Sequence, residues 1–130
     1  MERSQQRNVN PYEILAPIGE VVGRGLVASG KGCVGVVRRA SRVADVFALM
    51  KEPSLGETIL LTEFATATAV VPLLGKVRGL VCTSGGITSH LAIVSREFGL
   101  TCLMAASIED PEALEGVRVT LTEDGTIERA

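Results

Sequence analysis

The chain has 130 residues, of which 46% are hydrophobic, and its only aromatic residues are three phenylalanines and one tyrosine. This length fits one domain that buries about two-thirds of its unfolded surface, and the apolar content excludes intrinsic disorder. A net charge of −2 indicates neither nucleic acid nor an anionic membrane as a partner. A core built from Val, Leu, Ile and Ala suits an α/β or β-rich domain.

The N-terminal part divides into a polar arm and a glycine-rich segment. Residues 1–18 contain two prolines and predict a flexible arm or a subunit contact, which leaves residues 19–130 as the folded domain. Residues 20–29 and 33–39 are rich in Val and Gly and predict two strands. The Ser-Gly-Lys-Gly sequence at 29–32 predicts the turn of a glycine-rich hairpin between them.

This segment matches two nucleotide-binding motifs in its residues but not in the secondary structure that follows. Gly23 to Ala28 matches a dinucleotide fingerprint, and Gly25 to Lys31 nearly matches a phosphate-binding P-loop. Both motifs need a following helix, whose N-terminus binds the phosphates. Here residues 33–37 have strand character, and Gly32 replaces the Ser or Thr that would bind magnesium. The hairpin is therefore the preferred interpretation.

The middle of the chain alternates helical and extended patterns. Residues 43–50 carry apolar side chains at helical spacing (Val43, Val46, Phe47 and Met50) and predict one short helix. Thr58 to Thr62 predicts a central parallel strand. Ala65 to Leu74 predicts a helix that is capped near Thr66 and closed by Gly75.

The C-terminal part predicts a strand–helix–strand unit followed by a hairpin. The strands are expected at 79–82 and 102–105, with a helix from Leu91 to Phe98 between them. Pro111 to Leu114 predicts a turn. Residues 117–121 and 126–129 flank Asp124-Gly125, and an Asp-Gly pair is a strong hairpin signal.

Cysteine usage and charge give weaker indications. Cys33, Cys82 and Cys102 are scattered without a CxxC pattern, which is typical of buried, reduced thiols in a cytoplasmic protein. Neither a metal site, a signal peptide nor a membrane-spanning segment is predicted. Arg38, Arg39 and Arg42 form a basic cluster, interpreted as a solvated turn, with contact to the nucleotide phosphates of a partner as the alternative.

Residues 83–99, T-S-G-G-I-T-S-H-L-A-I-V-S-R-E-F-G, contain His90, the only histidine in the chain. The Gly85-Gly86 pair after an apolar strand allows a tight turn and close approach of another molecule. Thr88 and Ser89 are natural N-cap residues, and Gly99 supplies the C-terminal stop. His90 is therefore expected in the first turn of a helix, where free N–H groups and the helix dipole favour an anion.

The order strand, G-G-x-T-S-H, helix resembles the phosphohistidine swivelling domain of the phosphoenolpyruvate (PEP)-utilising enzymes. The usual wording of that family is roughly V-T-x-x-G-G-x-T-S-H-x-A-I-V-A-R-x-x-G-I-P-x-V-x-G, and residues 81–105 follow it closely. A weaker likeness covers residues 19–129, including the glycine-rich strands and the final strand–turn–strand. The resemblance implies a three-layer β/β/α domain with a central, mostly parallel sheet.

The resemblance also implies a chemistry, in which His90 is transiently phosphorylated. Histidine suits this role because its free ring nitrogen is nucleophilic near neutral pH, and a nucleophilic side chain divides one difficult transfer into two easier ones. Thr88 is then the candidate hydroxyl that fixes the tautomer of the ring, and Ser89 caps the helix. Gly85 and Gly86 would leave room for the donor and offer backbone N–H groups.

Arg96 falls at the arginine of the family pattern. A helix count places it nearly two turns from His90, so a surface or docking role is predicted rather than contact with phosphate. The chain departs from the family pattern at five positions. Since none of them removes the nucleophile, the departures bear only on the subfamily. They are Cys82, Ser84, Ser95, Thr101 and Ala106, the last of which lies near the glycine that normally follows the strand.

Multidomain relatives phosphorylate the histidine at a nucleotide-binding domain and pass the phosphoryl group to or from a separate barrel. This chain has room for neither. The expectation is a phosphoryl carrier that binds no cofactor itself, preferably a stand-alone subunit and otherwise an excised domain. ATP and Mg are expected on an ATP-binding partner, with a second partner for PEP, pyruvate or another acceptor. Oligomerisation is left open. The alternatives are a non-catalytic regulatory or assembly module of the same fold and a small-anion-binding domain.

Overall fold

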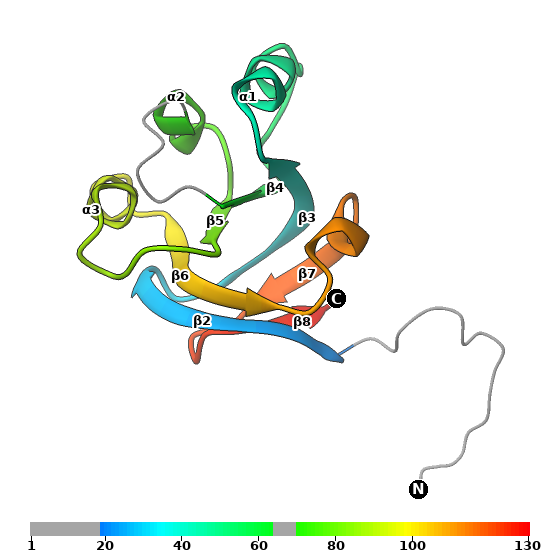
Figure 1. Cartoon of the computed structure of the whole chain (residues 1–130), viewed down its shortest axis with the longest axis vertical. Coiled ribbons are helices and arrows are strands. Elements are labelled where there is room, and N and C mark those ends of the chain that lie inside the picture. The colour runs from blue at the N-terminus through cyan, green and yellow to red at the C-terminus, as the bar shows by residue number, and fades with distance from the viewer. Residues whose placement is uncertain (1–18, 64–69) are drawn as a thin grey trace, which may run out of the picture.

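The computed structural model describes residues 19–63 and 70–130. Strands and helices alternate through the middle of the chain and strands close both ends (Figure 1). The elements of the described residues are, in chain order, β2 (Val21–Ser29), β3 (Cys33–Ala40), α1 (Val43–Met50), β4 (Thr58–Thr62), α2 (Val71–Leu74), β5 (Gly79–Cys82), α3 (His90–Glu97), β6 (Thr101–Ile108), the 3₁₀ turn η2 (Pro111–Leu114), β7 (Arg118–Leu121) and β8 (Thr126–Arg129).

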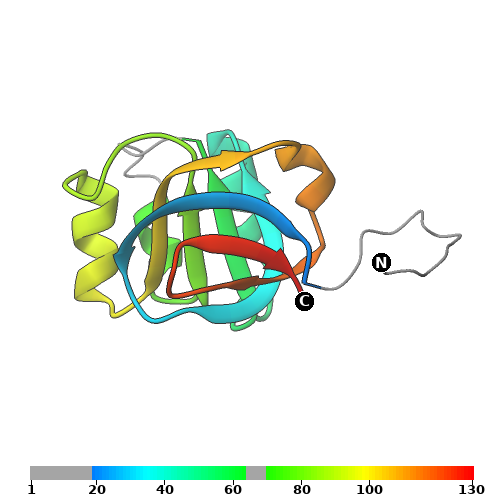
Figure 2. The same cartoon turned by 90° about the horizontal axis from the view of Figure 1, so that it is seen from below.

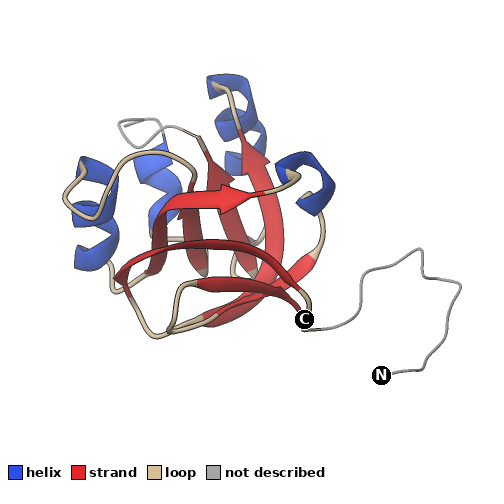
Figure 3. Cartoon of the chain, turned by 60° about the horizontal axis from the view of Figure 1, so that its bottom comes forward, coloured by secondary structure: helices blue, strands red, loops and turns tan. Residues whose placement is uncertain are grey.

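The strands join into one closed ring in the order β2-β6-β5-β4-β3-β7-β8. Neighbours within β3-β4-β5-β6 run parallel, and the other four pairings are antiparallel. Figure 3 shows the strands curling round while helices α1, α2 and α3 lie outside the ring. The predicted mixed α/β class is confirmed, and β4 is the central parallel strand expected at Thr58–Thr62.

Two hydrophobic clusters fill this arrangement because successive side chains of a strand point to opposite faces. In β4, Leu60 belongs to the cluster under the helices, whereas Ile59 and Leu61 belong to the cluster inside the ring. The same alternation divides β6, where Met104 packs toward the helices and Leu103 toward the ring interior. Both faces of the parallel strands are thus buried, as near-continuous apolar runs predict.

The two predicted N-terminal strands are confirmed, but the predicted hairpin between them is wrong. β2 pairs with β6 and β8, and β3 pairs with β4 and β7, so the turn at 30–32 carries the chain from one part of the ring to another (Figure 2). Gly30 and Gly32 have φ angles of 82° and 102° and lie against Thr101 and the Leu121 carbonyl, so close that a Cβ would collide with either. The glycines serve this close crossing rather than a two-stranded hairpin.

Helix α1 has the predicted bounds but an unexpected buried face. Of the four apolar residues whose spacing predicts the helix, Val46 alone is buried, and its buried companion is Leu49. Phe47 is 59% exposed. For the helix expected at Ala65 to Leu74, the described part is α2, followed by Gly75 as C-cap, while the predicted start and the Thr66 cap lie outside the described residues.

At the C-terminal end the predicted hairpin is confirmed, since β7 and β8 pair antiparallel around Asp124 and Gly125, which has a φ of 91°. The last parallel strand extends further than expected, to Ile108. None of the helices in the described ranges is long and apolar enough to cross a membrane.

Strand β6 contains a local distortion at Ala105, the one non-glycine residue with positive φ (51°) among the described residues. The pairing with β2 shifts there, because Leu26 lies opposite Met104 whereas Arg24 lies opposite Ser107. One extra residue on β6 therefore makes a β-bulge. In the family wording quoted above, position 105 is a glycine, which reaches this backbone conformation without steric cost.

Candidate phosphohistidine site

His90 is the first residue of α3, and local sequence explains why the helix begins there. Ser89 has an extended backbone, and its hydroxyl accepts a hydrogen bond from the Ala92 N–H at 3.3 Å. This is the N-cap arrangement predicted for a serine at this place. The helix ends at Glu97, with Phe98 as C-cap and Gly99 at a φ of 69°. The predicted helix is therefore confirmed, one residue earlier than expected at each end.

One face of α3 packs on the sheet and leaves His90 outside. Leu91, Ala92 and Ser95 are buried, as the helical period requires for residues on one side. His90 is exposed, and Ile93, three residues further, is 44% exposed. The ring therefore does not belong to the core, and a second molecule can reach it.

The loop between β5 and α3 is built from a few backbone contacts. At its start the Thr83 N–H donates to the Thr62 carbonyl (3.0 Å) and the Ser84 hydroxyl to the Glu63 carbonyl (2.6 Å). At its end the Ser89 N–H donates to the Gly86 carbonyl (3.0 Å). Gly85 has a φ of 73°, and a Cβ at Gly86 would have no atom within 4 Å. The glycine pair thus gives a tight turn with open space beside it.

The N-terminus of α3 supplies the electrostatics for an anion. The N–H groups of His90 and Leu91 have no acceptor within the helix because the chain before them is not helical. The partial positive charge of the helix dipole is concentrated at the same end. An anion bound at this end of the helix would therefore be stabilised by these donors and by the dipole.

Comparison with known proteins agrees with this geometry. Residues 55–126, more than half of the chain and including the loop and α3, match the family described as "PEP-utilising enzyme, mobile domain". The chain belongs to this family. The resemblance predicted from the motif is thereby confirmed, and we refer to the chain below as a mobile domain.

The mobile domain is 34% identical over 108 residues to a phosphoenolpyruvate synthase of Pyrococcus furiosus, covering 82% of this chain and 12% of that protein. It is 32% identical over 88 residues to a chloroplastic pyruvate, phosphate dikinase 1 of Arabidopsis thaliana, covering 68% of this chain and 9% of that one. The chain thus spans about an eighth or less of the length of these relatives. In fold it is similar to the solution NMR structure of a UPF0107 protein, with a TM-score of 0.53 and 12% identity, covering 84% of this chain and 99% of that one.

Thr88 lies in the loop of the mobile domain two residues before His90, and it is exposed. Within the described ranges its hydroxyl makes no hydrogen bond to the imidazole. Its predicted role in orienting the ring stays a prediction, as do the phosphate contacts of Gly85, Gly86 and Ser89.

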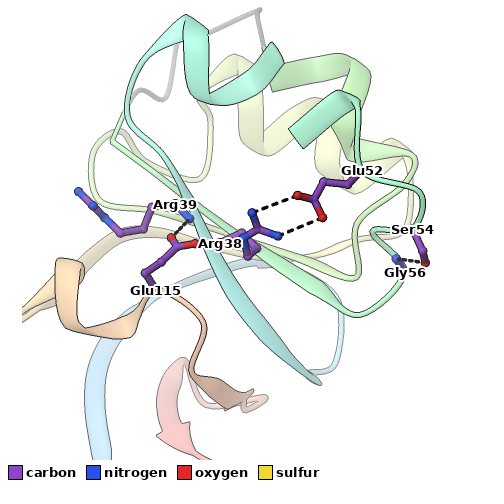
Figure 4. A network of polar contacts seen from close by, with 6 residues as sticks. All are labelled: Arg38, Arg39, Glu52, Ser54, Gly56 and Glu115. Atoms are coloured by element: carbon purple, nitrogen blue, oxygen red, sulfur yellow. Dashed lines mark hydrogen bonds and ion pairs between the residues drawn. The ribbon is translucent and has the colours of Figure 1, made fainter. Parts of the chain in front are cut away.

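In the basic cluster of β3 and the following turn, Arg38 is paired with two acids (Figure 4). Arg38 forms ion pairs with Glu52 at 3.4 Å and Glu115 at 3.0 Å, and these two carboxylates raise its pKa. The Arg39 backbone N–H donates to the other Glu115 oxygen at 2.7 Å. Arg38 and the Arg39 backbone therefore join β3 to Glu52, just beyond α1, and to Glu115, before β7. The interpretation of the cluster as a solvated turn stays a prediction.

A cavity at the carboxyl ends of the parallel strands was not foreseen from the sequence. It has a volume of about 230 Å³ and includes Arg39, Ser41, Thr83 and Ser107 in its lining. Thr83 also begins the loop to His90, so the cavity and the loop share one edge of the sheet. Its polar side chains come from separate segments, so no contiguous motif could have revealed it.

The thiols of the mobile domain are free, and Cys82 and Cys102 are buried as predicted, whereas Cys33 is half-buried. Burial raises the pKa of Cys102 to about 11, against a smaller lowering by the Ser95 hydroxyl. Burial also raises the pKa of Cys33. Cys33 and Cys102 are therefore protonated at neutral pH and are not nucleophiles in the site.

Proposed function

We propose that this mobile domain is a phosphoryl carrier, whose His90 takes a phosphoryl group at one active site and gives it up at another. The observation that carries the proposal is the exposed imidazole at the first position of α3, behind the Gly85-Gly86 turn, in a chain that belongs to the mobile-domain family. A phosphoryl carrier needs a reactive group at its surface to which the phosphoryl group can be attached.

The transfer needs little beyond a positioned nucleophile. The unprotonated ring nitrogen of His90 supplies the electron pair for the new N–P bond. The P–O bond to the donor breaks at the same time, and the leaving group departs with the electron pair of that P–O bond. The proton on the second ring nitrogen is then free to pass to solvent or to a neighbouring acceptor. The second transfer reverses these roles, with an oxygen of the acceptor attacking phosphorus and the imidazole leaving.

The N-terminus of α3 supports this cycle by stabilising the charge that arrives. The N–H groups of His90 and Leu91, which have no acceptor within the helix, and the dipole favour the phosphoryl oxygens. The Gly85-Gly86 turn adds unhindered backbone beside them. We propose that Ser89 keeps these donors in place through its cap, and that Thr88 orients the ring once a partner has closed over the loop.

The proposal implies partners, since the described residues contain only the carrier. We propose an ATP-binding partner that holds the nucleotide and Mg, and a second partner, or second part of a longer chain, that holds PEP, pyruvate or another acceptor. The support is that the relatives named above are a phosphoenolpyruvate synthase and a pyruvate, phosphate dikinase. We also propose the three-layer β/β/α swivelling arrangement and a cytoplasmic location, both of which stay predictions.

The test uses the fact that the chain contains a single histidine. The chain is incubated with uniformly ³²P-labelled ATP or with labelled PEP, and the nucleotide-binding and barrel parts of a phosphoenolpyruvate synthase are added in trans. The expected product is an acid-labile, base-stable adduct that is absent in His90→Ala. Lys31→Ala, an exposed change in the β2–β3 turn, serves as the matched control and should be labelled like the wild type.

An adduct that persists in His90→Ala would place the phosphoryl group elsewhere and refute the carrier role. Failure of the wild type to be labelled by either donor, with circular dichroism showing a folded chain, would favour the regulatory or assembly module. Binding of inorganic phosphate without any covalent label would favour the small-anion-binding domain.

A further inference from the structure

Arg96 lies in the last turn of α3, yet its guanidinium reaches back to the loop that precedes the helix. Its Nε and Nη2 atoms donate to the Ala28 carbonyl at 3.2 and 3.1 Å. Nη2 also donates to the Ile87 carbonyl at 3.2 Å. One side chain therefore joins the end of β2 to the middle of the loop, although Ala28 and Ile87 are far apart in sequence.

The β2 end of this link is firmly held. Ala28 is the penultimate residue of β2, and the hydroxyl of the next residue, Ser29, donates to the Leu100 carbonyl at 2.5 Å. The chain segments before and after Leu100 are α3 and β6, so β2 is fixed to both. The Ala28 carbonyl is thus a fixed point of the barrel, from which Arg96 can hold a more movable segment.

Among the residues that the structure describes, few other hydrogen bonds are seen in the loop. The hydrogen bonds of Thr83 and Ser84 fix its beginning, and Ser89 fixes its end. Between them come Gly85 at positive φ and Gly86 with open space around it, and neither residue restricts the backbone. The contact with Ile87 is the side-chain contact that the described residues place between these anchors, three residues before His90.

We propose that Arg96 is a positioning residue for phosphoryl transfer. It sets the course of the loop from Gly85 to Ser89, and through the loop it sets the direction of the backbone N–H groups that face a phosphoryl group on His90. This inference rests on the proposed carrier function, and it differs from the surface or docking role that the sequence predicts for Arg96. Its N–H groups are directed to carbonyls of its own chain rather than to a partner.

The chemistry of arginine distinguishes these roles. A planar guanidinium can serve two carbonyls at once with fixed geometry, whereas a lysine ammonium is a single charge on a flexible stem. If Arg96 acted as a docking charge, Arg96→Lys would retain most of the function. If it holds the loop, Arg96→Lys should behave like the uncharged Arg96→Met.

The first experiment measures hydrogen exchange of the backbone amides at 85–89 in the full chain. Arg96→Lys and Arg96→Met should both raise these exchange rates about tenfold, because charge-assisted hydrogen bonds that close the loop are lost. Amides of the buried strands β4 and β5 should be unchanged. The matched control is Arg118→Lys, which alters an exposed arginine paired with Glu57 at 2.9 Å and should leave the loop unaffected.

The second experiment measures the rate of His90 phosphorylation against the concentration of the nucleotide-binding partner. For both Arg96 variants the maximal rate should fall about tenfold while the half-saturating partner concentration stays constant. An Arg96→Lys variant with wild-type exchange and a wild-type rate would overturn the proposal. So would a raised half-saturating concentration with an unchanged maximal rate, which is the signature of docking.

The two experiments separate this inference from the carrier function. If the wild type is never phosphorylated, the carrier function fails, and the exchange rates alone decide whether Arg96 holds the loop. If the wild type is phosphorylated and Arg96→Lys exchanges and reacts like it, the carrier function stands and the positioning role is wrong.

Discussion

Replacing Ser95 by alanine should make the domain more stable, although it deletes a polar group from the middle of α3. Ser95 is fully buried against the sheet, and its hydroxyl has no hydrogen-bond partner within the described residues. The neighbouring polar group is the Cys102 thiol, which is a weak hydrogen-bonding group. The family wording has alanine at this position.

The magnitude follows from three contributions. An unsatisfied buried hydroxyl costs about 1–3 kcal/mol in desolvation, and alanine is favoured over serine in a helix interior by roughly 0.5 kcal/mol. Against this, removing one packed oxygen loses dispersion contacts and leaves a small void, at a cost of about 1 kcal/mol. The net expectation for Ser95→Ala is a rise of about 1 kcal/mol in the free energy of unfolding, or about 4 °C in Tm.

Urea unfolding followed by circular dichroism measures this change as a higher midpoint with an unchanged slope. The matched control is Ser89→Ala, the same atomic deletion in the same helix, which removes the N-cap and should lower the free energy of unfolding by about 1 kcal/mol. Opposite signs for the two variants are the expected outcome. If Ser95→Ala destabilises the domain as Ser89→Ala does, the Ser95 hydroxyl has a partner and the reasoning is wrong.

Three further predictions concern other parts of the domain. The Asp45 carboxylate accepts hydrogen bonds from two backbone N–H groups just before α1, which lower its pKa. Asp45→Ala should therefore lose stability above the usual titration range of aspartate, and its difference from the wild type in urea unfolding should shrink as the pH falls through the lowered pKa. Ala105→Gly should raise the free energy of unfolding by up to about 1 kcal/mol, seen as a higher urea midpoint, because it relieves the left-handed backbone. Ala106→Gly, at a buried position, should lower the midpoint. At pH 8 a thiol reagent should leave Cys102 and Cys82 unmodified until denaturant is added, since both are buried and the pKa of Cys102 is raised to about 11; rapid labelling of either thiol in the native chain would contradict this.

Local sequence signals predicted the elements well because each element carries its own start and stop. Helix α3 begins at a serine cap and ends before Gly99, and the β7–β8 hairpin follows from Asp124-Gly125. Both depend on residues a few positions apart. The exposure of His90 follows from the same spacing, since its place in the first turn and the apolar residues after it determine which side of the helix is buried.

Contacts between distant segments could not be predicted in this way. The pattern at 20–39 is consistent with a hairpin. In the structure, however, both edges of β2 are paired with β6 and β8, and both edges of β3 with β4 and β7, so the two strands do not pair with each other. The contact of Arg96 with Ala28 depends on where β2 ends relative to α3. Residue spacing along the helix gives no information about that position. Phe47 shows the same limit, because helical spacing does not say which side of α1 the sheet covers.

The division of burial along α3 connects the fold to the proposed function. Leu91 and Ala92, the two residues after His90, are both buried, so the first turn cannot move without disturbing the core under the helices. Phosphoryl transfer requires the reacting atoms to meet in a narrow range of geometry, and a nucleophile on a frayed helix end would not meet that requirement. At the first position the His90 ring is exposed and its N–H has no acceptor within the helix, as the proposed carrier role requires, while the next two residues hold the helix. A histidine one turn later would have its N–H used within the helix, and one at position 91 or 92 would point into the core.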